Sequence, residues 1–440
     1  MKELFYILGQ KDSSSLPSFK NSASFPLMKP IPELLAPAGT LQKLHYAFAY
    51  GADAVYAGLP FFSLRAREND FSYENLKKGI EHAHQLNKKV YLTANIFARN
   101  LKIKPFMETI GQLVNLKPDA FIMSDPGLIS IVKEKHPEVP IHLSVQANCM
   151  NWKSVEFWKN VGVSRIILSR ELRLEEIIKM KEMVPDMELE AFVHGSICIA
   201  YSGRCLLSHY MSYRDANQGV CDNTCRYPMK LYEKKSQYYV QDPRSEELYP
   251  IDEDENGTYI MNAKDLRLIE FLKEIIEAGI CSLKIEGRTK SIYYLATVTR
   301  AYRKALDDYQ AGRPFDKSLI QELNKVSNRG YHSGFMMNKI SHELQNYEFS
   351  TTGGQGSPFC GLVEDNKNEF AIVNVRNQIK KGQAYEAIGP RSQKVVHVES
   401  ILNKKGQEVD LVHSGIGNVM IRFDQKPEPF SIIRALSTPL

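Results

Sequence analysis

Four of the seven cysteines lie within 28 residues of one another, and thiols gathered in this way can hold a metal. They are Cys198, Cys205, Cys221 and Cys225, in the spacing C-x6-C-x15-C-x3-C. Four thiolates complete a tetrahedral zinc site or hold an iron–sulfur cluster. The spacing matches neither the paired cysteines of a zinc ribbon nor the ferredoxin run. It therefore predicts a metal site and leaves the identity of the metal open.

Polar side chains follow the short apolar runs of the first 290 residues, where they could line a binding site. The candidate substrate-binding residues are Arg65, Arg67, Asn95, Gln146, Asn148, Arg170, Glu171, Lys284 and Arg288. Lys284 and Glu286 are two residues apart and share one face of a strand, and Glu286 is a candidate catalytic group. His194 directly precedes the cysteine segment. It is a second catalytic candidate as a proton donor, or it only hydrogen-bonds the cysteine segment.

Motifs of common hydrolases and nucleotide-binding enzymes are missing from the sequence. The nearest approach to HExxH is His342-Glu343, which is followed by Leu344, Gln345 and Asn346. There is no GxSxG nucleophile elbow and no Walker loop. A protease of these classes is therefore not indicated.

The elements that must position these residues follow a repeating pattern, in which a short apolar run precedes a segment of helical periodicity. Eight such runs predict strands, at Ile31–Ala36, Ala54–Gly58, Val90–Ile96, Ala120–Ser124, Ile141–Ala147, Arg165–Leu168, Leu189–Val193 and Ser282–Ile285. Thr40 and Ser72 are typical N-caps of the first two helices, and Pro126 opens a later one. Eight alternating units predict a closed (β/α)8 TIM-like barrel. The competing open, doubly wound sheet would need fewer strands and a GxGxxG after the first.

The cysteines fall in one abnormally long connection, the insertion at 198–264 after the seventh strand. In a barrel such a connection lies at the C-terminal face, where active sites sit. The next helix is expected over Asp265–Ala278. We predict a flexible N-terminal extension at 1–30, a barrel domain at 31–347 and a small antiparallel β-barrel at 358–440, beyond the linker STTGGQGSP. The last domain is an RNA-binding accessory or a structural cap.

Composition sets the class of protein. Hydrophobic residues make up 43% and charged residues 24% of the 440, which is typical of a globular chain and excludes a wholly disordered one. No apolar stretch approaches a membrane span, and the apolar run at Leu4–Leu8 is too short for a signal peptide. We therefore expect a cytoplasmic protein with no membrane partner, whose isolated Cys149, Cys281 and Cys360 are small buried residues. A net charge of +5 is compatible with an RNA partner.

Several long motifs resemble the peptidase U32 family, first labelled collagenase-like proteases. They include PELLAPAGTLQKLHYAFAYGADAVYAG, IHLSVQAN, FVHGSICIAYSGRCLLS, CDNTCR and KIEGRTKS, and the resemblance runs from about Pro32 to Asp308, with a similar C-terminal domain. The sequence most resembles the bacterial branch responsible for hydroxylating wobble uridine of tRNA to 5-hydroxyuridine. Relatives in the family act on ribosomal RNA or in ubiquinone biosynthesis.

The resemblance implies an oxygen-independent, prephenate-dependent hydroxylation that relies on the iron–sulfur assembly machinery. It also implies that Cys198, Cys205 and Cys221 bind a 4Fe–4S cluster, with Cys225 as the fourth ligand. On this interpretation Arg65, Arg67, Arg170 and Arg288 bind a dicarboxylate or tRNA phosphate. A flipped uridine would be recognised by Asn95, Gln146 and Asn148.

Two other functions remain open from the sequence. One is a collagenase-like metalloprotease, which should degrade gelatin and lose that activity with a chelator. The other is a zinc-stabilised, non-catalytic RNA-binding protein, which should be colourless and leave tRNA uridine unmodified.

Overall fold

The computed structural model divides the chain into two compact units, Met1–Pro30 and Ile31–Leu440. It describes residues 30–59, 62–63, 70–198, 201, 203–205, 207–212, 214–216, 220–226, 230–234, 237–241, 248–251, 264–337 and 357–436. The predicted extension at 1–30 lies outside these ranges except for Pro30, and so does the predicted linker except for Ser357 and Pro358. None of the helices in the described ranges is long and apolar enough to span a membrane.

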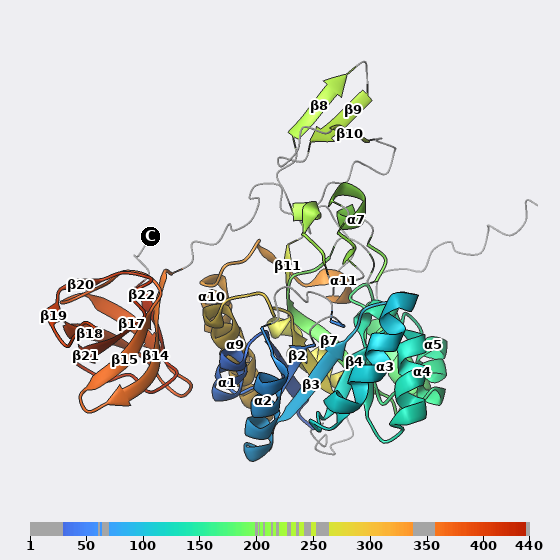
Figure 1. Cartoon of the computed structure of the whole chain (residues 1–440), viewed down its shortest axis with the longest axis horizontal. Coiled ribbons are helices and arrows are strands. Elements are labelled where there is room, and N and C mark those ends of the chain that lie inside the picture. Colours follow the sequence, from blue (N-terminus) through green and yellow to red (C-terminus); the bar gives the residue numbers. More distant parts are fainter. Residues whose placement is uncertain are drawn as a thin grey trace, which may run out of the picture. The chain divides into compact units, whose positions relative to one another are not determined.

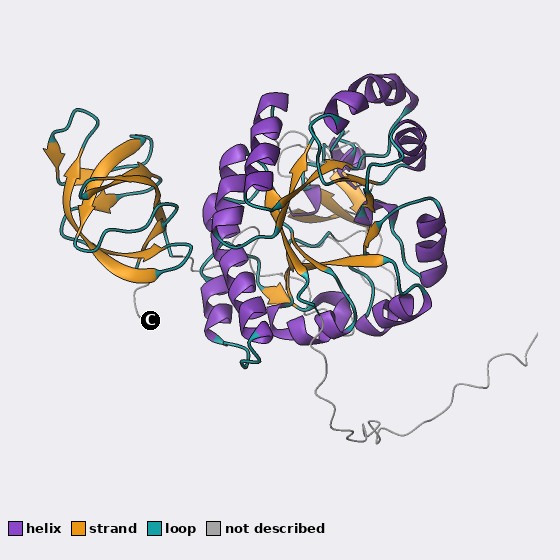
Figure 2. Cartoon of the chain, turned by 90° about the horizontal axis from the view of Figure 1, so that it is seen from below, coloured by secondary structure: helices purple, strands orange, loops and turns teal. Residues whose placement is uncertain are grey.

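Eight parallel strands of the described chain close into a barrel, as the repeating pattern predicts. Each strand pairs with the next along the chain, and β12 pairs with both β1 and β7, which closes the circle (Figure 2). Their side chains are almost all buried, which explains why several of the runs are continuously apolar. The strands are β1 (Glu33–Ala38), β2 (Ala54–Gly58), β3 (Lys89–Ala94), β4 (Ala120–Met123), β5 (Ile141–Leu143), β6 (Arg165–Ile167), β7 (Glu188–Gly195) and β12 (Ser282–Ile285).

Helices follow the strands and surround the barrel (Figures 1 and 2). Thr40 caps the first helix by accepting from the Lys43 amide, and Ser72 caps the second by accepting from Asn75, so both predicted N-caps are confirmed. The helices are α1 (Leu41–Ala49), α2 (Tyr73–Gln85), α3 (Asn100–Val114), α4 (Pro126–Lys135), α5 (Trp152–Asn160), α6 (Leu174–Met183), α8 (Leu272–Glu277), α9 (Ile292–Gln310) and α10 (Ser318–Asn324).

The long connection after β7 contains short elements of its own, and its end differs from the prediction. The helix expected over Asp265–Ala278 is wrong in its first half, because β11 (Asp265–Arg267) is a strand that runs antiparallel to β7. A 3-10 turn, η5 (Ile269–Phe271), then leads into α8. The remaining described elements before the C-terminal domain are η2 (Val145–Ala147), which takes the place of the last part of the strand predicted at Ile141–Ala147, α7 (Leu207–Ser212), η4 (Thr224–Arg226), β8 (Lys230–Lys234), β9 (Gln237–Gln241), β10 (Leu248–Ile251), β13 (Tyr331–His332) and α11 (Gly334–Met337).

The C-terminal residues form the predicted antiparallel barrel. Six strands of the described range pair in the order β17-β22-β14-β15-β21-β18, and the pairing of β17 with β18 closes the barrel. The short strand β19 pairs with the end of β18. The bounds are β14 (Phe359–Lys367), β15 (Phe370–Val375), β16 (Ile379–Lys380), β17 (Ala384–Ile388), β18 (Gln393–Leu402), β19 (Glu408–Val409), β20 (Leu411–Val412), β21 (Asn418–Phe423) and β22 (Ile432–Ala435).

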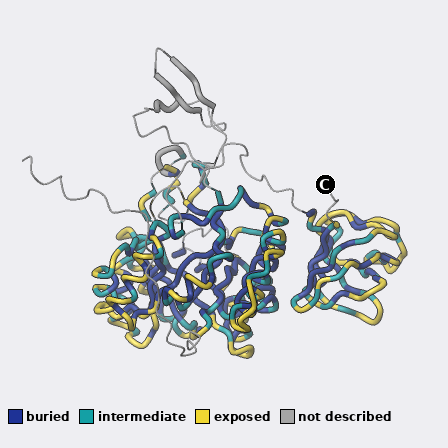
Figure 3. Tube along the Cα trace, turned by 180° about the vertical axis from the view of Figure 1, so that it is seen from behind, coloured by how far each residue is buried: buried dark blue, intermediate teal, exposed yellow. Residues whose placement is uncertain are grey.

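A fully buried arginine connects the C-terminal strands to the helices of the first barrel. Arg434 donates to the Tyr293 hydroxyl at 3.1 Å and to Glu386 at 2.8 Å, and it pairs with Glu322. Tyr50 adds a hydroxyl that donates to the carbonyl of Ile388 at 2.6 Å. Buried residues line the inside of each barrel, as Figure 3 shows. A charge buried this completely is tolerated because two carboxylates compensate it.

Candidate functional site: the C-terminal mouth of the barrel

The central feature of the barrel mouth is a carboxylate held by a cation and a phenol. Arg170 follows β6 and Glu286 follows β12, and the guanidinium Nη2 lies 3.9 Å from Oε2 of that carboxylate. The Tyr56 hydroxyl, from β2, donates to the same oxygen at 3.3 Å. Parallel strands end at one face of the barrel, which is why residues from three strands meet here. The structure thus brings together two of the residues predicted from the sequence.

The guanidinium of Arg170 is fixed by its neighbours and keeps one donor unused. Its plane centre lies 3.9 Å from the ring centroid of Phe192, and Nη1 donates to the carbonyl of Ser196 at 2.6 Å. Its Nε atom is buried and has no hydrogen-bond partner among the described residues. An arginine fork of this kind matches the oxygens of a carboxylate or phosphate. The mouth therefore contains a positioned donor for an anionic or carbonyl oxygen.

A second predicted arginine lines the wall of the mouth through hydroxyl groups. Arg288 is 6% exposed, and its Nη1 donates to Ser63 Oγ at 2.7 Å and to Thr93 Oγ1 at 3.0 Å. These two hydroxyls also lie 2.9 Å apart. Its backbone carbonyl accepts from the ammonium of Lys43 at 2.9 Å. The cation is therefore held in one orientation at the ends of β2, β3 and β12.

The predicted amides gather at the ends of β3 and β5. Asn95 Nδ2 donates to Ser144 Oγ at 3.2 Å, and the backbone N–H of Gln146 donates to the same hydroxyl at 3.4 Å. Asn148 has a positive φ of 52°, and its Oδ1 accepts from Ser169 at 2.9 Å. These side chains are partly exposed, and so is that of Glu171, which follows β6. The amides offer both donors and acceptors to a base edge, as recognition of a uridine requires.

Lys284 lies deeper than the mouth, in an ionic network that was not predicted. Its ammonium is 2.8 Å from Oε1 of Glu190, whose other oxygen lies 3.3 Å from Arg165 Nη1. Arg165 also pairs with Glu33 at 2.8 Å. Burial lowers the pKa of Lys284, and the carboxylate of Glu190 opposes that shift. The only signal in the sequence was the presence of charged residues inside predicted apolar strands.

His194 belongs to β7, and its side chain packs outside the barrel interior, against tyrosines of α9 and β13. Its ring centroid is 5.2 Å from Tyr331, 5.5 Å from Tyr302 and 5.9 Å from Tyr294. Nδ1 lies 3.4 Å from the Tyr302 hydroxyl, and the side chain is fully buried. Burial lowers the pKa of His194 to about 3, so its ring is neutral at physiological pH. Its backbone carbonyl accepts from the Glu286 amide at 2.8 Å, whereas its side chain packs among the three tyrosines.

The cysteine segment reaches the mouth through two contacts. A Cβ at Gly203, where φ is +72°, would lie 2.2 Å from the carbonyl oxygen of Gln146, so only glycine allows this approach. Arg99, which precedes α3, pairs with Asp215 at 3.0 Å. Figure 1 shows α7, which carries part of this segment, at the end of the barrel where β7 leads out. The predicted Arg65 and Arg67 lie outside the described residues.

The four clustered cysteines form no disulfide with a described residue. Cys198 and Cys221 are exposed, Cys205 and Cys225 are half-buried, and the Asn223 amide donates to Cys221 Sγ at 3.4 Å. The donor set therefore suits zinc or an iron–sulfur cluster. In the described part of the chain, no three His, Cys, Asp or Glu side chains have the arrangement of a metal site. The chemistry of the ligands is thus present on one segment.

The prediction of small buried residues is confirmed for two of the other three cysteines. Cys149 and Cys360 are each 2% exposed, and Cys281 is half-buried. Burial raises the pKa of the Cys149 and Cys281 thiols to about 12 and that of Cys360 to about 11. These thiols remain protonated and unreactive at neutral pH.

Comparison with known proteins places the chain in a family. Residues 39–346 match the model of peptidase family U32, and residues 355–434 match that of the peptidase family U32 C-terminal domain. The chain is 43% identical to tRNA hydroxylation protein P of Haemophilus influenzae, over 92% of this chain and 95% of that protein. It is 45% identical to tRNA hydroxylation protein P of Escherichia coli K12, over 86% of this chain and 91% of that protein. The solved structure of the U32 peptidase Mk0906 aligns with 63% of this chain and 99% of that chain, at 15% identity and a TM-score of 0.38. The chain belongs to the peptidase U32 family.

Proposed function

We propose that this protein is an RNA-hydroxylating enzyme that converts the wobble uridine of tRNA to 5-hydroxyuridine, without oxygen and with prephenate. The observation that carries the proposal is its similarity, over 86–92% of its length, to two proteins named for tRNA hydroxylation. The mouth of the barrel supports it, because it offers anion donors and base-recognising amides on one face. The coarser conclusion, hydroxylation of RNA, depends only on the similarity.

The residues of the mouth have distinct roles in this proposal. Arg170 and Arg288 bind the carboxylates of the co-substrate or a phosphate of the RNA, since both guanidinium groups are fixed before binding. Asn95, Gln146 and Asn148 bind the edge of a uridine turned out of its stack. Glu286, held by Arg170 and Tyr56, lies within the same face and accepts or holds a proton.

We further propose that Cys198, Cys205, Cys221 and Cys225 together hold a 4Fe–4S cluster. The support is that the four cysteines lie on one segment that contacts the mouth at Gly203. A bound cluster would supply redox chemistry beside the mouth. The iron–sulfur assembly machinery would then be a partner of this chain.

The test is the modification of tRNA in a bacterial host that lacks its own tRNA hydroxylation genes. Expression of the chain should restore 5-hydroxyuridine in digested tRNA measured by mass spectrometry, and a host unable to make prephenate should show none. Arg170→Met should abolish the product, whereas the buried Cys149→Ala should retain it. Unmodified tRNA with a folded, expressed protein would refute the proposed substrate, and chelator-sensitive degradation of gelatin would favour the protease.

The cluster has a separate readout in the purified protein. Protein isolated without oxygen should be brown and hold about four iron atoms per chain. Cys198→Ser should lose most of this iron, and Cys149→Ala should keep it. A colourless wild-type protein with one zinc atom would refute the cluster, and it would favour the zinc-stabilised alternative if tRNA also stayed unmodified.

A further inference from the structure

Two buried acceptors have no donor where the cysteine segment joins the barrel. They are Nε2 of His194, in β7, and Oδ2 of Asp265, the first residue of β11. Neither atom has a hydrogen-bond partner among the described residues, and the two residues are 0% and 1% exposed. An unsatisfied buried acceptor is costly, so a native site of this kind normally contains a donor.

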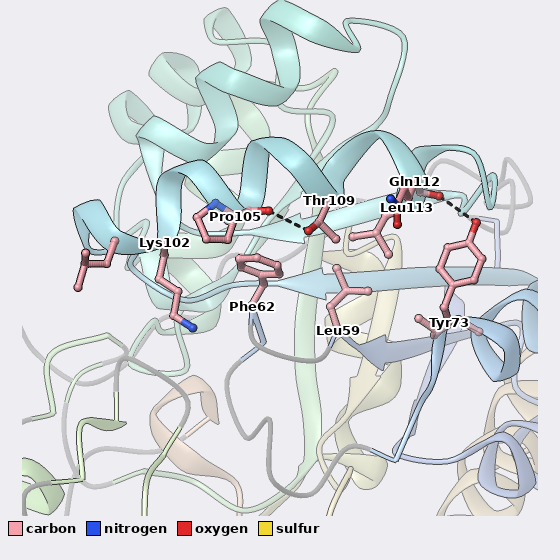
Figure 4. A pocket seen from close by; sticks show the side chains of 10 residues that line it. Leu59, Phe62, Tyr73, Lys102, Pro105, Thr109, Gln112 and Leu113 are labelled. Carbon is pink, nitrogen blue, oxygen red and sulfur yellow. Dashed lines mark hydrogen bonds between the residues drawn. The ribbon is translucent and has the colours of Figure 1, made fainter.

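The apolar pocket along α3 differs from this site, because its hydroxyl groups already have acceptors. The pocket has a volume of about 530 Å³ (Figure 4). Tyr73 donates to the Gln112 carbonyl at 3.4 Å. Thr109 donates to the Pro105 carbonyl at 2.8 Å. The chemistry of a ligand can therefore be inferred at the two unpaired acceptors, and not from the lining of this pocket.

Strand pairing places the two acceptors on one face of the sheet and near each other. His194 pairs with Arg267 across β7 and β11, and Asp265 lies two residues before Arg267, on the same face. Diagonal neighbours of this kind are about 7 Å apart. Two hydrogen bonds through one water molecule span about 5.5 Å. The separation therefore suits a single bridging molecule of this size.

The surrounding side chains also show that the two acceptors face the same space. The Tyr331 ring lies 5.2 Å from that of His194. Burial raises the pKa of the Tyr331 hydroxyl, and the negative charge of Asp265 raises it further. Burial lowers the pKa of His194, and the same charge opposes that shift. Tyr331 therefore borders both residues.

The hydroxyl groups around His194 are already used as donors. Because the Tyr302 hydroxyl donates to a backbone carbonyl, its oxygen is left to accept from Nδ1 of His194, 3.4 Å away. The neutral ring therefore has its hydrogen on Nδ1, and Nε2 is a bare acceptor. The three neighbouring tyrosines and the carbonyls to which they donate are Tyr302 with Val193 at 2.7 Å, Tyr294 with Glu286 at 3.1 Å and Tyr331 with Leu323 at 3.1 Å.

The charge around the site favours a neutral donor over a metal ion. Oδ1 of Asp265 accepts from Nε of Arg329 at 3.1 Å, and both side chains are almost fully buried. This ion pair already compensates the carboxylate. A divalent cation bound by His194 and Asp265 would add uncompensated charge to a buried site, which is expensive. A water molecule adds no charge and has two hydrogens for two acceptors.

We propose that His194 and Asp265 together bind one internal water molecule, which donates one hydrogen to Nε2 and the other to Oδ2. β7 leads into the cysteine segment and β11 follows it, so this water joins the two ends of that segment. It adds a link between side chains to the backbone pairing of the two strands. A water molecule held in this way is part of the protein structure and is costly to remove.

The first experiment is a crystal structure of the full-length protein at a resolution that shows ordered water. We expect density for one water molecule within about 2.7 to 3.2 Å of both Nε2 of His194 and Oδ2 of Asp265. A direct hydrogen bond between the two side chains, or no density between them, would overturn the proposal. Density for a metal ion, with ligands at about 2.0 to 2.2 Å, would also overturn it.

The ring nitrogens of His194 are tested separately in solution. Long-range nitrogen–proton NMR spectra of the protein with isotope-labelled histidine identify the ring, since its signals are missing from His194→Phe. We expect a protonated Nδ1 and an unprotonated Nε2 at neutral pH. A hydrogen on Nε2 would contradict the proposal, because the ring would then be a donor and not an acceptor.

Relaxation dispersion of the water oxygen nucleus counts long-lived internal water molecules without a crystal. His194→Phe removes one of the two acceptors, so the count should fall by one, while circular dichroism checks that the protein folds. His397→Phe is the matched control, because His397 also lies beside a carboxylate, that of Asp424 at 3.0 Å, but is 58% exposed. Its count should equal that of the wild type. An unchanged count in folded His194→Phe would refute the site, and if this variant does not fold, the crystal structure of the wild type still decides.

The outcomes are independent of the proposed function, because no measurement involves tRNA, prephenate or a bound cluster. A protein that holds this water molecule and fails to modify tRNA would refute only the proposed function.

Discussion

The buried pair of Glu190 and Lys284 makes a quantitative prediction for the substitution Glu190→Gln. The ammonium and the carboxylate lie 2.8 Å apart, and their side chains are 4% and 0% exposed. The substitution leaves Arg165 with Glu33 at 2.8 Å and Glu188 at 2.7 Å, so the main loss falls on Lys284. Removing one partner of a buried ion pair costs about 3 to 5 kcal/mol. Because glutamine can still accept a hydrogen bond, we expect about 3 kcal/mol, or roughly a hundredfold in the folding equilibrium.

The cost should depend on pH in a defined direction. Burial already lowers the pKa of Lys284, and loss of the Glu190 carboxylate removes the group that opposes this shift. The unfolded chain then binds more protons than the folded protein at every pH between the folded-state pKa of Lys284 and about 10.4. Stability therefore rises with pH in that window. The difference between the wild type and Glu190→Gln should shrink as the pH is raised from about 7 toward 10.

Urea unfolding followed by far-ultraviolet circular dichroism measures the effect at each pH. Glu188→Gln is the control, because Glu188 also pairs with Arg165 but its side chain is 51% exposed, and we expect a loss below about 1 kcal/mol. The double variant Glu190→Gln/Lys284→Met should recover at least half of the lost stability and show no such pH dependence. A loss in Glu190→Gln no larger than in Glu188→Gln, or a difference that grows with pH, would refute the reasoning.

Three further substitutions test other parts of the molecule. Arg170→Met should lower 5-hydroxyuridine formation at least a hundredfold without unfolding the protein. Arg170→Lys should be equally inactive, because an ammonium cannot reproduce the planar fork that lies on Phe192. Activity in Arg170→Lys would contradict this role. Burial lowers the pKa of His194 to about 3 in the folded protein, against 6.5 in the unfolded chain, so the free energy of unfolding falls as the pH drops from 6.5 to 3. Urea unfolding of His194→Phe should show a smaller fall than that of the wild type over this range. An unchanged slope would show that His194 is not buried as a neutral ring. Arg434→Met should lower the free energy of unfolding, measured with urea, by about 3 kcal/mol. The control is Arg391→Met, which should lower it by about 0.5 kcal/mol or less because the Arg391 side chain is 88% exposed. Equal losses would contradict the buried pairing of Arg434.

The first barrel was predictable because its strands are buried on both faces. Continuous apolar runs such as Ala54–Gly58 and Ala120–Met123 mark such strands, and capping residues mark the starts of the helices between them. The strand at Asp265–Arg267 was not predictable in this way. It forms because its backbone pairs with Gly195 and His194, some 70 residues earlier, and this non-local pairing overrides the local helical pattern.

The side-chain contacts of individual site residues were harder to predict from the sequence than the helices and strands that carry them. Positions after strands correctly indicated that Arg170 and Glu286 share the mouth, because all parallel strands end at one face. Depth along a strand was not predictable for Lys284, since its partner Glu190 is 94 residues away. The rotation of His194 toward α9 follows from an irregular register between β7 and β12, which no local pattern encodes.

Phe192 separates the charges that stabilise the barrel from those that face the mouth. Its ring contacts Arg170 at 3.9 Å and Lys284 at 5.5 Å, and it occupies the strand position two residues beyond Glu190. Glu33, Arg165, Glu190 and Lys284 compensate one another below this ring at distances of 2.8 to 3.3 Å. A ligand entering from the C-terminal face therefore meets Arg170, Glu286 and Tyr56 before it could reach Lys284. This order favours a structural role for Lys284, so its substitution should change the free energy of unfolding, whereas substitution of Arg170 should change the reaction.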